Sequence, residues 1–215
     1  MKLELYSNNL SPFAQMVELL LECKGVEFSV ILPDRQFVRE GGFVEISPLR
    51  KVPVLVVDGV AVPETQVIFE LVEDLYPTPS LLPADPMLRS QVRLLTRITD
   101  VYFAGPSVQL LNNAFVEKSA DIEEYVLGMM GRGVRALETW IGTGQFAIGE
   151  SRSHADCVLP PVFYFIKQCL PALGVSGAPV FGDKTAQYYD TIIKDGNVQK
   201  CLSRMEAAVK EKAGK

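Results

Sequence analysis

The residues with the strongest chemical implications lie between Ser47 and Glu70. Two valine-rich runs, Val52–Val57 and Val60–Val62, are joined by Asp-Gly, which predicts a β-hairpin with a tight turn. Pro53 lies near the start of the first run, where it has no N–H to donate to a sheet. A residue next to such a proline can leave its own N–H and C=O facing out of the sheet, free to pair with an extended peptide. The pattern indicates a docking edge for a small peptide-like ligand, with a plain edge strand as the alternative.

Two further places combine a polar side chain with the predicted start of a helix. Ser11-Pro12 is typical of an N-cap followed by proline at the first helical position. Glu64-Thr65 opens the helix that follows the hairpin, where free backbone N–H groups suit a ligand carboxylate. An ordinary helix start needs no ligand, so a purely structural role stays open at both places.

Composition disfavours several classes of partner. The chain has 215 residues, of which 48% are hydrophobic, enough for one large or two modest domains. Its 21 basic and 26 acidic residues give a net charge of -5, and no run of Lys or Arg stands out. We therefore expect neither nucleic acid nor an anionic membrane as a partner.

The few metal-ligating and sulfur-containing residues point away from metal and disulfide chemistry. The four cysteines are scattered without a C-x-x-C pair, and the chain has one histidine, so neither a zinc site nor a disulfide framework is expected. The first residues, MKLELYS, alternate like a strand and lack the apolar core of a signal peptide, and no stretch reaches the length of a membrane span. We expect a cytosolic protein without a metal.

The first part of the chain predicts a mixed sheet covered by helices. In chain order we expect a strand, a helix from Pro12 to Gly25, a second strand and an irregular helix broken at Gly41-Gly42. The hairpin and the helix Glu64–Tyr76 follow. The expected strands before the hairpin are Lys2–Tyr6 and Val26–Leu32, and the irregular helix is Arg35–Ile46. The order predicts four strands, with the first two parallel because a helix connects them.

Beyond a proline-rich stretch the strand pattern disappears. Residues 78–86 predict a linker, because their prolines suit neither a helix nor a central strand. Residues 87–215 predict an all-helical domain. Its expected helical stretches are Met87–Ala114, Asp121–Ile141, Ser153–Leu170, Lys184–Ile193 and Val198–Lys212. Ser153 and Asp156 have the spacing of a capping box, so we interpret His154, between them, as a helix-terminus residue and not as a base.

This order of elements resembles the cytosolic glutathione S-transferase superfamily over essentially the whole chain. Four segments carry the resemblance: SPFAQMVELLLECKGVEF, SPLRKVPVL, PETQVIFELVEDLYP and FAIGESRSHAD. The resemblance implies a thioredoxin-like glutathione-binding domain over residues 1–77, the linker, and an all-α domain over residues 87–215. The fold class is therefore α/β followed by all-α.

The resemblance also implies a glutathione site. Pro53 would be cis, Val52 would pair with the cysteinyl backbone of glutathione, and Glu64-Thr65 would hold its γ-glutamyl end. Lys51 matches a contact to the glycyl carboxylate, with a solvated lysine as the alternative. The remaining glutathione-binding candidates are Phe13 and Arg39.

In related proteins the position of Ser11 carries the catalytic group. A hydroxyl that donates to the sulfur, next to a helix N-terminus, favours the thiolate over the thiol. A serine cannot form a mixed disulfide, so thiol–disulfide reductase chemistry is disfavoured. Ser7 and Tyr6 are the alternatives: a strand-end serine that points toward the same helix, and a tyrosine that is catalytic in other classes.

The resemblance places the electrophilic second substrate between the two domains. One wall would come from Asn8, Asn9, Leu10 and Phe13, and the other from Arg97, Tyr102 and Phe103. The sequence departs from the family where Met16, Val17 and Glu18 replace an Arg-x-Arg pattern, and it lacks the two serines and cysteine of the zeta class. These differences leave the class and the substrate open.

The resulting hypothesis is a glutathione transferase that activates glutathione as a thiolate against a small, hydrophobic electrophile. The alternatives are a glutathione-dependent isomerase or ether-cleaving lyase with a dedicated substrate, and a binding or scaffold protein without catalytic activity. The resemblance further implies a homodimer.

Overall fold

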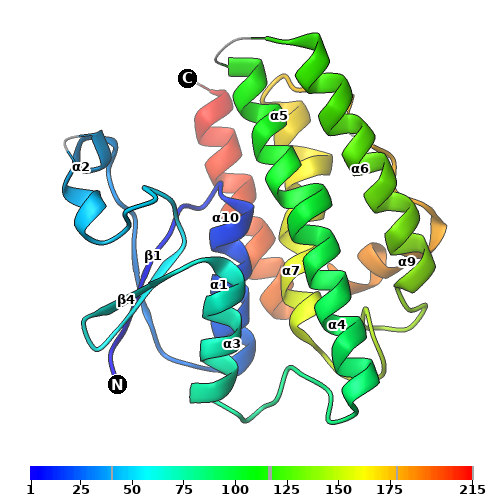
Figure 1. Ribbon diagram of the computed structural model, residues 1–215, viewed down its shortest axis with the longest axis horizontal. Helices are drawn as coiled ribbons and strands as arrows, with labels where there is room; N and C mark the ends of the chain where they lie inside the picture. Colours follow the sequence, from blue (N-terminus) through cyan, green and yellow to red (C-terminus); the bar gives the residue numbers. More distant parts are fainter. Residues whose placement is uncertain (40, 116–117, 178, 215) are drawn as a thin grey trace. The chain divides into compact units, whose positions relative to one another are not determined.

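The computed structural model describes residues 1–39, 41–115, 118–177 and 179–214. The chain divides into two compact units, Met1–Ser80 and Leu81–Lys215 (Figure 1). Each unit contains fully buried apolar side chains. The two units are of different structural class, because all strands within the described residues belong to the first unit.

A four-stranded mixed sheet forms the first unit. The strands are β1 (Leu3–Tyr6), β2 (Ser29–Ile31), β3 (Val54–Val57) and β4 (Val60–Pro63). Their order in the sheet is β2-β1-β3-β4, with β2 parallel to β1 and β3 antiparallel to both β1 and β4. The predicted mixed sheet is confirmed. β2 is shorter than the expected Val26–Leu32, because it is an edge strand that pairs with only three residues of β1.

Helix α1 (Pro12–Lys24) begins and ends where the sequence predicts. Ser11 is its N-cap, Pro12 is its first residue, and Gly25 ends it in the left-handed conformation, with φ 66°. Only glycine adopts this φ without a steric penalty, so Gly25 fixes the point at which the chain turns into β2. The helix is buried along most of its length, from Ala14 to Leu21.

The remaining helices of the first unit cover the sheet. Helix α2 (Arg35–Arg39) and the short 3₁₀ segment η1 (Gly42–Glu45) replace the predicted irregular helix, and Gly41, with φ 90°, separates them. Helix α3 (Thr65–Leu75) contacts α1. Figure 1 shows α1 and α3 together on one side of the sheet and α2 on the other.

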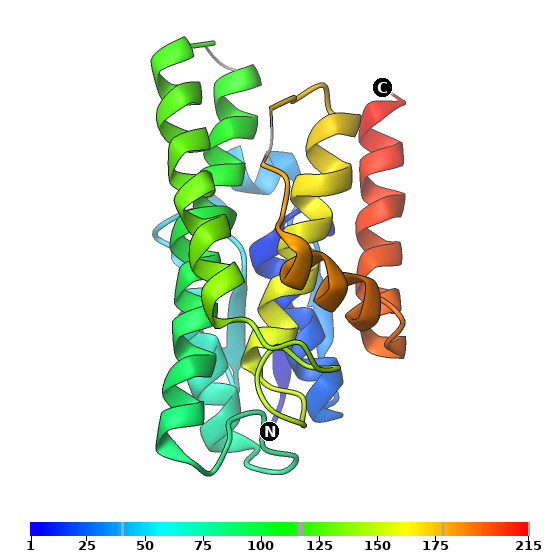
Figure 2. The same cartoon turned by 90° about the vertical axis from the view of Figure 1, so that its right-hand side faces the viewer.

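Helices, and no strands, make up the regular secondary structure in the described part of the second unit. Its helices are α4 (Pro86–Thr99), α5 (Gly105–Phe115), α6 (Ala120–Trp140), α7 (His154–Tyr164), α8 (Leu170–Ala172), α9 (Asp183–Ile192) and α10 (Gly196–Ala213). The central helix is α7, which contacts α4, α9 and α10 (Figure 2). None of the helices seen in the described ranges is long and apolar enough to cross a membrane.

Two π-helical segments interrupt the helices that the sequence predicts as continuous. Segment η2 (Asp100–Ala104) joins α4 to α5, and η3 (Phe165–Cys169) joins α7 to α8. In η2 the N–H of Gly105 donates to the carbonyl of Asp100, five residues earlier. The prediction from periodicity did not separate these segments from the α-helices on either side of them.

The start of α7 has the predicted capping box. Ser153 and Asp156 make both reciprocal hydrogen bonds, and Asp156 also accepts from the Ala147 N–H at 2.8 Å and the Tyr188 hydroxyl at 3.0 Å. His154 is the buried first residue of the helix, as predicted. Pro86, which we placed in the linker, is instead the first residue of α4, because Asp85 caps that helix.

A buried cation fixes the packing of α1 against α3. The ammonium of Lys24 lies 2.6 Å from the Glu73 carboxylate and donates to the carbonyls of Tyr76 at 2.8 Å and Pro79 at 2.7 Å. The Lys24 side chain is fully buried. A buried charge is tolerated only when such partners compensate for the water it has lost.

We predict that Lys24→Met lowers the free energy of unfolding by about 3–5 kcal/mol, because it leaves a carboxylate and two carbonyls without their cation. Urea denaturation measures the change. The control is Lys2→Met, which removes an exposed pair with Glu4 and should change stability by less than about 1 kcal/mol. Equal stability of the two variants would show that the Lys24 contacts do not stabilise the fold.

Candidate active site

Three segments of the first unit meet at one end of the sheet because of its register. Tyr6 and Pro63, the last residues of β1 and β4, both pair with Val54, the first residue of β3. The residues after Tyr6, before Val54 and after Pro63 therefore lie next to one another. These segments carry the candidates Ser7 to Phe13, Lys51 to Pro53, and Glu64-Thr65.

Ser11 lies at the N-terminus of α1, at the end of the first segment. Its backbone is extended, and its Oγ accepts a hydrogen bond from the Ala14 N–H at 3.3 Å. Because the oxygen acts as the acceptor in this bond, the hydroxyl proton remains for a further acceptor. The side chain is half-buried, as is that of Phe13. A ligand anion beside Ser11 would also be stabilised by the helix dipole.

The loop between β1 and Ser11 is held by its own hydrogen bonds. The Asn8 side chain accepts from the Leu10 N–H at 2.8 Å, and the Asn8 carbonyl accepts from the Ser11 N–H at 2.9 Å. Asn9 and Leu10 are half-buried. The position of Ser11 thus follows from the position of Asn8.

The two alternatives to Ser11 are engaged in other contacts. Ser7 is fully buried, and its hydroxyl donates a short hydrogen bond to the Glu18 carboxylate. The ring of Tyr6 packs on Phe43, with 5.8 Å between the ring centroids. Of the three candidates, Ser11 alone combines partial exposure with a position at the helix N-terminus.

A buried serine that sequence reasoning did not select shapes the second segment. The Ser47 hydroxyl donates to the Lys51 carbonyl at 3.0 Å and accepts from the Lys51 N–H at 3.3 Å. Arg50, with φ 53°, donates its N–H to the Ser47 carbonyl at 2.8 Å. Lys51 itself is exposed. The only sequence signal for this role was a Ser-Pro pair that begins the loop.

Val52 presents an open backbone at the start of β3. The Val52-Pro53 peptide bond is cis. Across the described ranges, no hydrogen bond involves the N–H or C=O of Val52. The strand pairing begins two residues later, at Val54. Val52 therefore has one donor and one acceptor available to an extended peptide, as the position of Pro53 indicated.

The third segment joins β4 to α3 through a strained residue. Glu64 has φ 72° and ψ 117°, a conformation that costs a non-glycine residue about 1–3 kcal/mol and that is often found at ligand sites. Its side chain is exposed and makes no capping hydrogen bond. Thr65, the first residue of α3, is 7% exposed. The free N–H groups of this helix start face the same sheet end as Val52.

The other predicted residues are distributed over three elements. Arg39 is the last residue of α2, and its side chain is not among those that the structure describes. In the helical unit, Arg97 forms an ion pair of 2.8 Å with Asp100. Tyr102 is half-buried, whereas Phe103 is fully buried and packs on Phe163 and Phe181. The Phe103 ring thus belongs to the core of the helical unit and does not line an open cleft.

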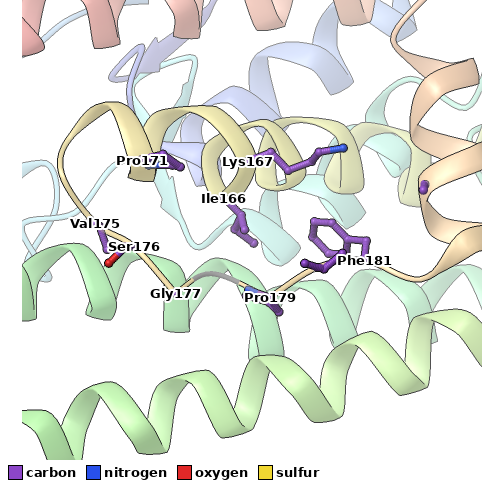
Figure 3. Close-up of a pocket in the computed structure, with 10 residues that line it drawn as sticks. Ile166, Lys167, Pro171, Val175, Ser176, Gly177, Pro179 and Phe181 are labelled. Carbon is purple, nitrogen blue, oxygen red and sulfur yellow. The ribbon is translucent and has the colours of Figure 1, made fainter.

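A cavity in the helical unit contains none of the predicted site residues. It has a volume of about 510 Å³ and lies between η3, α8 and the chain that precedes α9 (Figure 3). Ile166, Pro171, Val175 and Phe181 give it mainly apolar walls. No group of three metal-ligating side chains is found in the described part of either unit.

Comparison with known proteins agrees with this arrangement. The family model for the glutathione S-transferase N-terminal domain matches residues 10–75. This range includes the second and third segments and the part of the first segment from Leu10 to Phe13. Maleylacetoacetate isomerase from Mus musculus is 30% identical over 170 residues, which are 74% of this chain and 76% of that protein. A probable glutathione S-transferase from Nicotiana tabacum is 31% identical over 150 residues, 68% of this chain and 63% of that protein.

Solved structures show the same two-part fold. The maleylacetoacetate isomerase of Anaeromyxobacter dehalogenans, with glutathione bound in its active site, is 26% identical. It superimposes with a TM-score of 0.72 over 96% of this chain and 98% of that one. Sequence and structure therefore agree that this chain belongs to the cytosolic glutathione S-transferase superfamily.

Proposed function

We propose that this protein is an enzyme that binds glutathione and activates its thiol as a thiolate. The proposed site is the end of the sheet at which the three segments described above meet. The observation that carries the proposal is the open backbone of Val52, which lies beside the N-termini of two helices. An extended tripeptide can add to this edge through main-chain hydrogen bonds. The structural relative with bound glutathione supports the choice of ligand.

The polar groups around Val52 match the charges of glutathione. Its cysteinyl N–H and C=O pair with Val52, and its γ-glutamyl carboxylate takes the N–H groups at the start of α3, beside Glu64 and Thr65. The exposed Lys51 is suited to the glycyl carboxylate. Phe13, on the first turn of α1, contacts the same ligand, and Arg39 is a further candidate.

The role of Ser11 is to lower the pKa of the bound thiol. A thiol ordinarily ionises near pH 8.5, and each unit of decrease requires about 1.4 kcal/mol of preferential stabilisation of the thiolate. The Ser11 hydroxyl, which accepts from Ala14 and still has a proton to donate, supplies a hydrogen bond to the sulfur. The dipole of α1 acts in the same direction.

The thiolate then attacks an electrophilic carbon. In a transfer reaction with a chloronitroarene, sulfur donates an electron pair to form a C–S bond, and chloride leaves with the electrons of the broken C–Cl bond. The thiol proton is released to solvent. Asn9 and Leu10, near Ser11, are proposed to contact the electrophile, and the helical unit offers Arg97 and Tyr102.

An isomerase activity is the second candidate, because relatives named maleylacetoacetate isomerase match most of the chain. The same thiolate would add to a conjugated double bond and move its electrons to the carbonyl oxygen. After rotation about the new single bond, departure of the thiolate restores the double bond in the opposite geometry and regenerates the thiolate, so the composition of the substrate does not change. An ether-cleaving lyase would use the same thiolate, and binding without turnover of any electrophile would indicate a scaffold protein instead.

The assembly that we propose is a cytosolic homodimer.

We predict that Ser11→Ala lowers kcat/KM for glutathione conjugation to a chloronitroarene about 100-fold, because one donor to the developing negative charge is lost. The affinity for glutathione should change less than about threefold, since the main-chain contacts remain. Steady-state kinetics and calorimetric titration measure the two effects. The control is Ser203→Ala, at an exposed serine of α10. Full activity in Ser11→Ala would move the catalytic role to Ser7 or Tyr6.

We also predict that Thr65→Val weakens glutathione binding about tenfold, because it removes the Thr65 hydroxyl, which we propose as a donor to the γ-glutamyl carboxylate in addition to the backbone N–H groups. The pKa of the bound thiol should stay the same, because Thr65 does not contact the sulfur. Cysteinylglycine, which lacks the γ-glutamyl group, should bind equally to the wild type and to Thr65→Val. Thr191→Val, at a half-buried position of α9, is the matched control. Equal loss with both ligands would exclude a γ-glutamyl contact.

A further inference from the structure

A buried polar cluster lies behind the candidate active site. It consists of Ser7, the residue directly after β1, and of Gln15 and Glu18 on α1, and each is at most 2% exposed. The Ser7 hydroxyl and the Gln15 amide both donate to the same carboxylate oxygen of Glu18, the amide at 2.8 Å. A carboxyl group removed from water needs such donors, because its burial is otherwise unfavourable.

The cluster connects the two elements that position Ser11. On the side of the sheet, Ser7 is held by a second hydrogen bond: its N–H donates to the carbonyl of Ile31, the last residue of β2, at 2.9 Å. Glu18 is seven residues beyond Ser11, about two helical turns along α1. The bond from Ser7 to Glu18 therefore links the end of β1 to the body of the helix that Ser11 caps.

The short loop between these anchors transmits their position to Ser11. Only three residues separate Ser7 from Ser11, and Asn8 fixes two of the loop N–H groups. A shift of Ser7 must move Asn8 and hence Ser11, because so short a loop has little slack. Glu18 belongs to the stretch in which the sequence departs from the family pattern, so the resemblance does not account for it.

We propose that Glu18, through its hydrogen bond with Ser7, is a positioning residue for the Ser11 hydroxyl. This inference rests on the proposed function, because the property that Glu18 would affect is the pKa of a thiol bound beside Ser11. Glu18 does not touch that thiol. It holds the donor at the distance and direction that a hydrogen bond to sulfur requires, and a small displacement of a catalytic group can lower a rate strongly.

The experiment must separate this role from a contribution to stability alone. Lys24 is the internal control, because it is another buried polar anchor of α1, in contact with Glu73 at the far end of the helix. Lys24→Met should lower the melting temperature and leave the pKa of the bound thiol unchanged. The test variants are Ser7→Ala, Glu18→Leu, their double mutant, and the conservative Glu18→Gln.

The pKa of bound glutathione is measured by titrating the ultraviolet absorbance of its thiolate, alongside the pH profile of kcat/KM. We expect Ser7→Ala and Glu18→Leu to raise this pKa by about one unit, which is about a tenfold lower ratio of thiolate to thiol at any given pH. The double mutant should show no more than the larger single effect, because both changes break the same Ser7–Glu18 hydrogen bond. Glu18→Gln keeps an oxygen that accepts from Ser7, so its pKa should stay near that of the wild type.

An unchanged thiol pKa in folded Ser7→Ala would overturn the inference even if Glu18→Leu fails to fold. A rise in pKa for Lys24→Met as large as that for Ser7→Ala would also overturn it, since any destabilisation of α1 would then suffice. The proposed function fails differently: wild-type protein would bind no glutathione, or Ser11→Ala would leave the thiol pKa unchanged. A third outcome would overturn only the role of Glu18. In it, the wild type lowers the pKa of bound glutathione, Ser11→Ala abolishes this lowering, and Ser7→Ala preserves it.

Discussion

The pairing of the sheet stops at Pro53, and the arrangement of the whole candidate site depends on where it stops. Proline has no N–H to continue the ladder, so the register between β1, β3 and β4 ends at Val54. This end of the sheet has both a peptide-like edge at Val52 and two helix N-termini beside it. Backbone groups that lack partners within the fold thus gather where a short, doubly anionic peptide could use them.

Buried polar side chains hold the loops of this site in place. Ser47 closes the loop before Val52 through its hydrogen bonds with Lys51. Glu18 accepts a hydrogen bond from Ser7, directly after β1, and Lys24 links α1 to the end of α3. Each buried group is acceptable only because its hydrogen bonds replace those lost to water. Such contacts add less to stability than apolar packing would, but they specify geometry, and a hydroxyl that must meet a sulfur needs a defined position.

The sequence predicted the features that follow from local chemistry. Valine runs around Asp-Gly gave the hairpin, Ser11-Pro12 and Gly25 gave the limits of α1, and the spacing of Ser153 and Asp156 gave the capping box. Contacts between distant residues stayed hidden. Phe103 was predicted to line the substrate cleft, and nothing in the sequence indicated the buried contacts of Glu18 and Lys24. Apart from the Gln15–Glu18 bond within α1, these contacts join different elements, and periodicity records which face of a helix is buried but not what lies against it.

The most direct test of the central claim is a crystal structure of the protein with bound glutathione. The account predicts that the cysteinyl N–H and C=O pair with the backbone of Val52, and that the sulfur lies within hydrogen-bonding distance of Ser11 Oγ. Glutathione bound elsewhere, or with its sulfur directed away from Ser11, would contradict the account.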